Sequence, residues 1–137
     1  MPRPISLEEA MRMVEAALAE SRRREAKTAV SVVDARGDMI VTCRLDGARS
    51  YYPDVAYGKA IGAALWGDAS RNLSARSGNN SVQQRVNSLN GGRIVFAPGA
   101  VPLLRDGVVI GAIGVGGSGG ESDEEIAVIA AKLLDED

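Results

Sequence analysis

The chain has 137 residues, of which 45% are hydrophobic, 25% charged and only 4% aromatic, and its formal net charge is −2. This composition is typical of one globular domain built from aliphatic side chains, and it lacks the basic excess of a nucleic-acid-binding protein. Histidine is absent and Cys43 is the only cysteine, which excludes an internal disulfide and a cysteine zinc cluster and removes the commonest general base. We therefore expect no metal site and no nucleic-acid partner.

The sequence contains no linker, no repeat and no apolar run of membrane length. We therefore expect a single domain over residues 1–137, with no membrane partner and a cytoplasmic location. The first predicted element is a helix that begins after a capping box formed by Ser6 and Glu9 and ends near Arg24. Its expected inner face consists of Leu7, Ala10, Met11, Val14, Ala17 and Leu18.

A β-hairpin is predicted next, with strands at residues 28–34 and 39–45 and a turn at Gly37. A helix rich in alanine and glycine follows at residues 54–68, and such a surface allows close packing on a sheet or a partner subunit. A short helix with a cap at Ser81 and Gln84 comes after it.

Three further strands are predicted at residues 93–96, 101–105 and 108–115, the last two joined by a hairpin turn at Asp106-Gly107. Pro102 suits an edge strand. A last helix is expected after Gly120, with a capping box formed by Ser122 and Glu125. Short hairpins imply a mainly antiparallel sheet, so the element order predicts an α+β fold.

Residues 114–119 match the pattern G-x-G-x-x-G between a strand and a helix. Three acidic residues follow within the next five positions, where a dinucleotide phosphate would need the helix N-terminus, and they would repel it. A tightly turned corner explains the glycines without a ligand. A third interpretation is a glycine-lined wall against which a flat ligand contacts the backbone.

The chain resembles the GlcG/HbpS family in motifs that follow one another in order along nearly all its length. These motifs are VSVVDARG at residues 30–37, RLDGA at 44–48, KA at 59–60, VPL at 101–103, DGVVIGAIGVGG at 106–117, and Glu121 with Asp123 and Glu124. The resemblance implies a profilin-like fold, in which a five-stranded antiparallel sheet carries helices on both faces. It also implies a homo-oligomer, a dimer or larger.

Members of this family are associated with glycolate utilisation, with haem sensing and with the C-terminal domain of a corrinoid adenosyltransferase. Their shared property is binding of a small or flat organic ligand, which makes haem a possible cofactor. Some members hold haem iron through histidine, which this chain lacks. Replacement ligands would have to come from tyrosine, methionine, thiolate or lysine, and the candidates are Met39, Cys43, Tyr51, Tyr52 and Lys59.

Several residues are candidates for binding this ligand. Arg44 and Asp46 leave a strand end on one face, where they form either a surface salt bridge or an oriented carboxylate anchor. Tyr51 and Tyr52 either stack on a flat ligand or cover the core edge. Lys59 is either solvated or faces the ligand, where desolvation would make it a base or Schiff-base former.

The glycine corner at Gly116 and Gly117 completes the predicted ligand pocket, which we expect between the strand end at Arg44, the Tyr51–Tyr52 loop, Lys59 and this corner. The favoured function is binding of a small organic ligand, with haem or another tetrapyrrole as the leading candidate. The alternative is a cofactor-free isomerase, hydratase or lyase for a small carboxylate or aromatic compound. Lys59, Tyr52 and Glu121 are its candidates for proton transfer.

Overall fold

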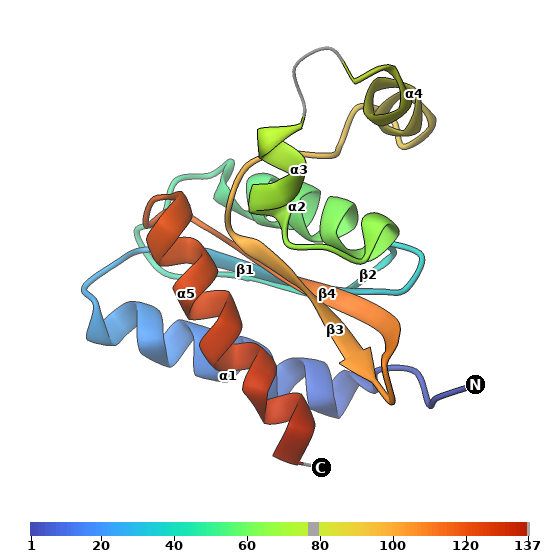
Figure 1. Cartoon of the computed structure of the whole chain (residues 1–137). Helices are drawn as coiled ribbons and strands as arrows, with labels where there is room; N and C mark the ends of the chain where they lie inside the picture. Colours follow the sequence, from blue (N-terminus) through green and yellow to red (C-terminus); the bar gives the residue numbers. More distant parts are fainter. Residues whose placement is uncertain (77–79, 137) are drawn as a thin grey trace.

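The computed structural model describes residues 1–76 and 80–136 (Figure 1). Within these residues the chain forms a four-stranded antiparallel sheet in the order β2-β1-β4-β3. The strands are β1 (Ala29–Asp34), β2 (Met39–Arg44), β3 (Ala100–Arg105) and β4 (Val108–Gly116). The α+β class and the antiparallel sheet are confirmed, and Pro102 lies on an edge strand as predicted.

The expected fifth strand at residues 93–96 is wrong. This segment passes over helix α2 (Tyr52–Trp66) and does not join the sheet. A Cβ atom added to Gly58 of α2 would lie 2.3 Å from the carbonyl oxygen of Arg93, so the two backbones touch at a residue without a side chain. The segment buries Ile94 against α2, where its side chain lies next to Gly62, and does not pair with either edge strand of the sheet.

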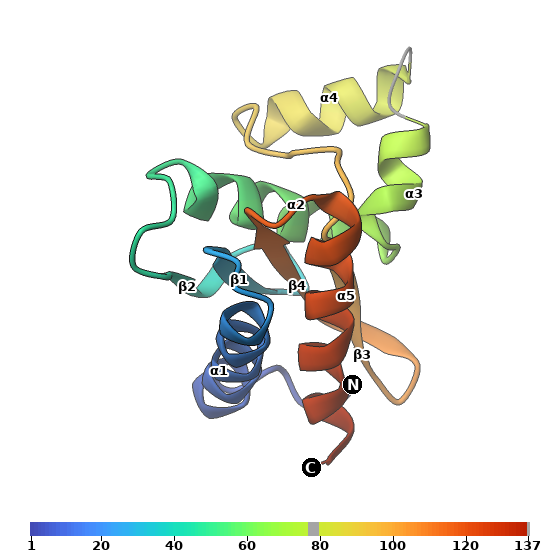
Figure 2. The same ribbon diagram turned by 90° about the vertical axis from the view of Figure 1, so that its left-hand side faces the viewer.

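Helices cover both faces of the sheet, as expected (Figures 1 and 2). On one face lie α1 (Leu7–Arg23) and α5 (Gly120–Ala131), which continues into a 3₁₀ helix, η1 (Lys132–Glu136). On the other face lies α2, and α3 (Ser70–Ala75) and α4 (Ser81–Leu89) lie beyond it, farther from the sheet. No helix in the described ranges is long and apolar enough to cross a membrane.

The helix ends agree with the sequence only in part. The capping box of Ser6 and Glu9 is present at the start of α1. Helix α4 is capped one residue earlier than predicted, because the side chain of Asn80 accepts a hydrogen bond from the backbone of Gln83. Helix α5 begins at Gly120 without a side-chain cap, so the predicted cap, Ser122, lies inside the first turn, where its hydroxyl accepts a hydrogen bond from Arg24.

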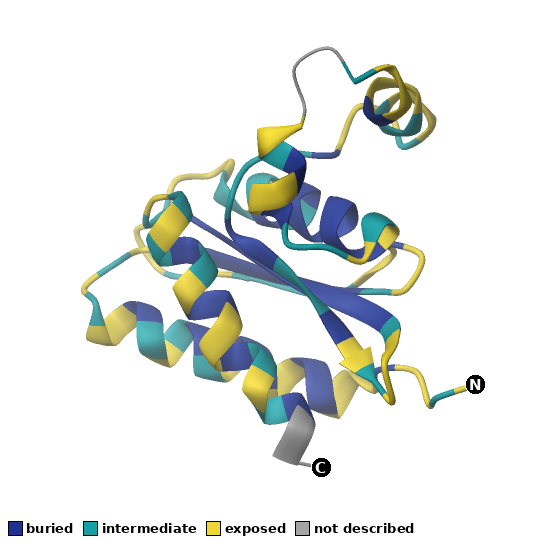
Figure 3. Cartoon of the chain, viewed as in Figure 1, coloured by how far each residue is buried: buried dark blue, intermediate teal, exposed yellow. Residues whose placement is uncertain are grey.

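The core has one part on each face of the sheet, and the central strands β1 and β4 are its most deeply buried strands (Figure 3). The larger part packs α1 and α5 on residues such as Val30, Ile113 and Val115. The smaller part packs the alanines of α2 on Val33 and Ala112. Two residues of the predicted inner face of α1, Leu7 and Met11, are exposed, and Met13 takes a buried position.

Candidate functional site

The strand register brings Arg44 and Gly116 into one row across the sheet. Ala29 of β1 pairs with Arg44 on one side and with Gly116 on the other. Directly paired residues leave the same face, and this is the face that α2 covers, because Gly116 lies against Val55 and Ala56 of that helix. Two strand spacings of about 4.8 Å therefore separate Arg44 from the glycine corner.

Tyr52 occupies the glycine corner. A Cβ atom added to Gly117 would lie 2.7 Å from Cδ2 of the Tyr52 ring, and Gly117 has a φ of +121°, so this position requires glycine. Tyr51 packs edge-on against Tyr52, with ring centroids 5.2 Å apart, and is itself exposed. Gly116 and Gly117 therefore meet a side chain of the same protein, and Tyr51 is the ring that solvent reaches.

Lys59 is buried and engaged within the protein. Its Nζ donates a hydrogen bond to the carbonyl oxygen of Val115 at 3.0 Å and pairs with Oδ2 of Asp123 at 3.1 Å. Gly99 leaves room for the lysine, since a Cβ atom there would lie 2.7 Å from Nζ. Lys59 is thus neither the solvated lysine nor the free pocket base that the sequence suggested.

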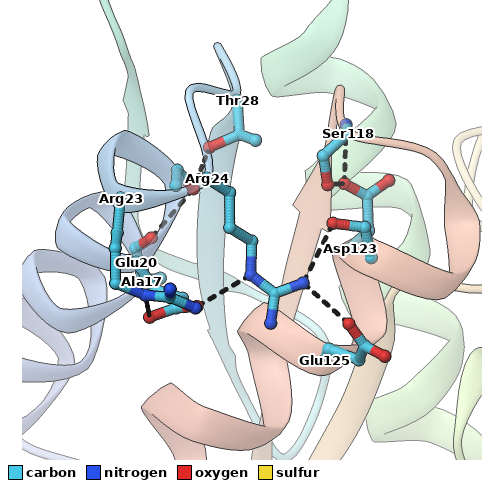
Figure 4. A network of polar contacts seen from close by, with 10 residues as sticks. Ala17, Glu20, Arg23, Arg24, Thr28, Ser118, Asp123 and Glu125 are labelled. Carbon is cyan, nitrogen blue, oxygen red and sulfur yellow. Dashed lines mark hydrogen bonds and ion pairs between the residues drawn. The ribbon is translucent and has the colours of Figure 1, made fainter.

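Asp123, which the sequence offered only alongside Glu121, is the acidic residue that reaches the interior. Its Oδ1 accepts hydrogen bonds from the backbone and the hydroxyl of Ser118 (Figure 4), while Oδ2 holds Lys59. Glu121 is exposed. The start of α5 is therefore occupied by a carboxylate of its own chain, as expected from the acidic run that argued against a nucleotide.

An open groove of about 600 Å³ lies beside the strand end at Arg44. Three segments line it: the last turns of α1, the connection to β1 and the end of β2. The lining residues are Leu18, Arg22, Glu25, Ala26, Lys27, Cys43, Arg44, Leu45 and Asp46. Of the predicted binding residues, Arg44 and Asp46 line this groove, Arg44 only at its rim, because its side chain leaves the α2 face of β2 whereas that of Cys43 leaves the α1 face. Tyr52, Gly116 and Gly117 lie at the neighbouring corner under α2, and Lys59 lies inside the protein.

The charged groups of this groove do not pair with one another. Arg44 and Asp46 form no salt bridge, and in the described part of the chain the side chains of Arg22, Lys27 and Arg44 have no hydrogen-bond or ion-pair partner. The stem of Lys27 lies against Gly47, where a Cβ atom would approach Cδ and Nζ to 3.1 Å. Neither Arg22 nor Lys27 is among the ligand-binding residues predicted from the sequence, although a lysine just before a buried strand was visible.

A separate network joins the end of α1 to α5 (Figure 4). Arg24 donates to Glu20, to Ser122 and to Glu125, and Arg23 also donates to Glu20. Hydrogen bonds from Arg23 and Arg24 lower the pKa of Glu20 from 4.5 to about 2. The hydrogen bonds that Arg24 donates to Glu125 and then to Glu20 raise the pKa of Arg24 above its usual value. These ion pairs fix the helix end that forms one wall of the groove.

The fold and this site define a small α+β protein whose sheet lies between helices and whose groove opens beside the sheet end. The family model described as "Haem degrading protein HbpS-like" matches residues 5–132. The chain therefore belongs to the HbpS-like family.

Curated proteins of similar sequence match nearly the whole of this chain. The corrinoid adenosyltransferase PduO of Salmonella typhimurium is 30% identical over 133 residues, which are 97% of this chain and 40% of PduO. The chain thus spans about two fifths of the adenosyltransferases it matches. An uncharacterised 15.0 kDa protein of Citrobacter freundii is 28% identical, over 96% of this chain and 93% of its own length.

Among solved structures, HbpS has a TM-score of 0.84 at 28% identity, covering 98% of this chain and 92% of HbpS. The structure described as a PduOC:Heme complex has the same TM-score and identity, covering 96% of this chain and 95% of that one. The protein ORFY of Klebsiella pneumoniae has a TM-score of 0.87 at 25% identity, covering 98% of this chain and 93% of ORFY.

Proposed function

We propose that this protein binds a small, flat organic ligand, and that haem or another tetrapyrrole is the first candidate. The observation that carries the proposal is the groove beside α1 and β2, where Leu18 and Leu45 line the wall and charged side chains of both signs stand at the rim, the unpaired Arg22 and Lys27 among them. Its volume of about 600 Å³ lies within the usual range of small-molecule sites. One related structure contains haem, which gives this ligand its priority.

The residues of the groove fit haem. Arg22 and Lys27 suit the two propionate groups, and the apolar side chains suit the ring. Cys43 is half-buried and lines the groove, so among the candidates for an iron ligand it is the one placed there. Lys59 is held by Asp123, and Met39 lies at the opposite end of β2. Bound haem would supply an iron centre with a thiolate ligand.

A haem titration followed by absorbance tests the proposal. We expect a saturable shift of the Soret band at one haem per chain, and we expect the position of this band to change in Cys43→Ser while binding persists through the ring and propionates. The matched control is Thr42→Ser, a neighbouring substitution on the opposite face of β2. Absence of any Soret shift at stoichiometric haem would contradict haem as the ligand.

The geometry does not favour the enzyme alternative. Its three candidates for proton transfer do not share a cavity in the described structure: Lys59 is buried against Asp123, Tyr52 packs on Gly117, and Glu121 is exposed on α5. Ligand binding is therefore the function that we propose.

A further inference from the structure

We infer that two copies of this chain pair through the outer edge of β2 and the adjoining face of α1, about a twofold axis that passes beside Leu18 and Cys43. The inference goes beyond the proposed function, because the pair needs no ligand. It follows from the backbone hydrogen bonds at the two edges of the sheet and from the charges on one face of α1.

The outer edge of β3 is closed to a further strand. Gly99 accepts a hydrogen bond from Val115 of β4, so by alternation the backbone groups of Ala100 and Pro102 point away from the sheet. The N–H of Ala100 donates to the hydroxyl of Ser70, and Pro102 has no N–H. Two donors that an added strand would need are therefore used or absent.

The outer edge of β2 is open. Leu45 donates to the carbonyl of Thr28, so Leu45 and Cys43 direct their backbone groups to β1, whereas those of Thr42 and Arg44 point outward. Among the described residues these outward groups have no hydrogen-bond partner. No proline lies in β2, so an antiparallel strand can pair with this edge.

The face of α1 beside this edge carries charges of both signs. Leu18 and Arg22 line the groove together with Cys43, so this face lies next to β2. Met11 and Glu15 share the face, at helical spacings from Leu18 and Arg22, and are exposed, as Arg22 is. In the described ranges the side chains of Glu15 and Arg22 have no hydrogen-bond or ion-pair partner.

This face is complementary to itself, which identifies the partner as a second copy. When two α1 helices pack antiparallel with the axis between Leu18 and Ala19, Glu15 of each copy lies opposite Arg22 of the other. The twofold axis repeats this ion pair. A parallel arrangement would instead place like charges opposite each other.

The strand edge gives its own axis. The outward groups pair when Thr42 of each copy faces Arg44 of the other, and this register places Cys43 on the axis. A register centred on Thr42 would set Asp38 opposite Asp46, and one centred on Arg44 would set two arginines opposite each other. Both alternatives juxtapose like charges, which destabilises a strand pair.

The two axes coincide. Cys43, at the centre of the strand pair, lines the same groove as Leu18, at the centre of the helix pair. Helix α1 and strand β2 also run in the same direction, because the segment before α1 lies near the β1–β2 turn and the last turns of α1 lie near the end of β2. One twofold rotation therefore satisfies both contacts.

The partner covers one end of the groove, because Leu18 and Cys43 belong to both surfaces. A ligand held by Cys43 competes with the partner strand, so the pair is tested in protein free of ligand. Helix α4 lies on the opposite side of the sheet from α1 (Figure 2), and a contact through α4 would join such pairs into larger particles.

Charge reversal tests the helix contact. Glu15→Arg and Arg22→Glu each replace two attractions by two repulsions, and each should raise the dissociation constant of the pair at least about tenfold and halve the particle mass in sedimentation at low micromolar concentration. Glu15→Arg/Arg22→Glu restores complementary charges and should restore the wild-type mass. The control is Glu121→Arg, at an exposed position on α5, which should leave the mass unchanged.

The strand contact has two tests. Thr42→Pro removes an outward N–H, as Pro102 does on β3, and should halve the mass, whereas Thr42→Ser should not. Residues that face each other on the axis of this register lie about 4.5 Å apart between Cα atoms, a separation that allows a disulfide. Oxidation by copper phenanthroline should therefore link two copies through Cys43, the only cysteine, in the wild type and far less in Glu15→Arg.

Several outcomes would overturn the interface: a monomeric wild type, wild-type mass in both single reversals, a double reversal that stays dissociated, or no disulfide at Cys43 after oxidation. The reversals lie at exposed positions and decide the question even if Thr42→Pro fails to fold, which circular dichroism shows. None of these measurements involves haem, so the interface and the proposed function fail or stand separately.

Discussion

Lys59 of α2 and Asp123 of α5 form an ion pair of 3.1 Å between Nζ and Oδ2, and both side chains are almost completely buried. The pair links elements on opposite faces of the sheet at the point where β4 ends and α5 begins. The remaining oxygen of Asp123 is satisfied by Ser118. A buried ion pair with its hydrogen bonds complete is costly to break from one side only.

We therefore predict that Lys59→Met lowers the free energy of unfolding by about 3–5 kcal/mol, because the carboxylate of Asp123 is left buried without its cation. Lys59→Met/Asp123→Asn should lose less than the sum of the two single substitutions, since it removes both charges. Urea denaturation measures all three variants. Glu121→Gln, on the exposed side of the same helix, is the control and should change stability by less than about 0.5 kcal/mol. An unchanged midpoint for Lys59→Met would contradict the buried pair.

The glycines of β4 provide a second prediction. Gly114→Ala should destabilise the protein by about 1–3 kcal/mol, because its Cβ would lie 2.3 Å from the carbonyl oxygen of Ala56 and force α2 away from the sheet. Gly116→Ala is the matched control two residues along the same strand, where the nearest atom would be 3.4 Å away. It should be neutral or gain about 0.4–1 kcal/mol through the unfolded state. Thermal unfolding compares the two, and equal melting temperatures would argue against close packing at Gly114.

Acid stability should depend on Glu20. Its pKa falls to about 2 in the folded protein, from 4.5, because Arg23 and Arg24 donate to its carboxylate. A carboxyl group with a lowered folded pKa stabilises the protein above its unfolded pKa and loses this contribution as the pH falls from 4.5 towards 2. In Glu20→Gln, stability between these pH values should decline less steeply. Glu15→Gln, on the exposed face of the same helix, should retain the wild-type slope in urea titrations across this range.

Arg44 should contribute directly to ligand affinity. We predict that Arg44→Ala weakens binding of an anionic ligand by about 1.5–3 kcal/mol, the usual worth of a hydrogen bond to a charged group. Arg36→Ala, at the opposite end of β2 in the turn after β1, serves as the control. Isothermal titration calorimetry with protoporphyrin IX provides the comparison. Identical affinities would assign Arg44 to the solvated surface.

Self-association remains a prediction. Val82 and Leu89 of α4 are apolar but 64% and 69% exposed. They lie seven residues apart, so their side chains share one face of the helix. Helix α4 itself lies away from the sheet (Figure 2). We predict a dimer or larger particle, which Val82→Ser/Leu89→Ser should dissociate by removing apolar contact. Leu7→Ser, an exposed leucine on α1, should leave the assembly intact. Light scattering that gives a 14.3 kDa particle for the wild type would contradict the prediction.

The sequence by itself determined the elements whose signals are local. The capping box needs only Ser6 and Glu9, and the β3–β4 hairpin needs only Asp106 and Gly107, both of which adopt positive φ. Such features depend on hydrogen bonds and backbone preferences within a few residues. The element order also predicted the α+β class, and the hairpin pattern placed the end of β2 at residue 45, one residue beyond its end at Arg44.

Tertiary structure decided everything that depends on partners far apart in the chain. Residues 93–96 have an apolar pattern suited to a strand, but they pack on α2, because Gly58 has no side chain and the two backbones can touch there. Lys59 looked available from the sequence, and only the fold placed it against Asp123, 64 residues away. The groove lies between α1 and β2. The side chain of Arg22 lines it without a partner among the described residues, whereas those of Arg23 and Arg24 form ion pairs with Glu20. Burial and charge pairing are set by which surfaces meet, and a one-dimensional pattern does not specify that.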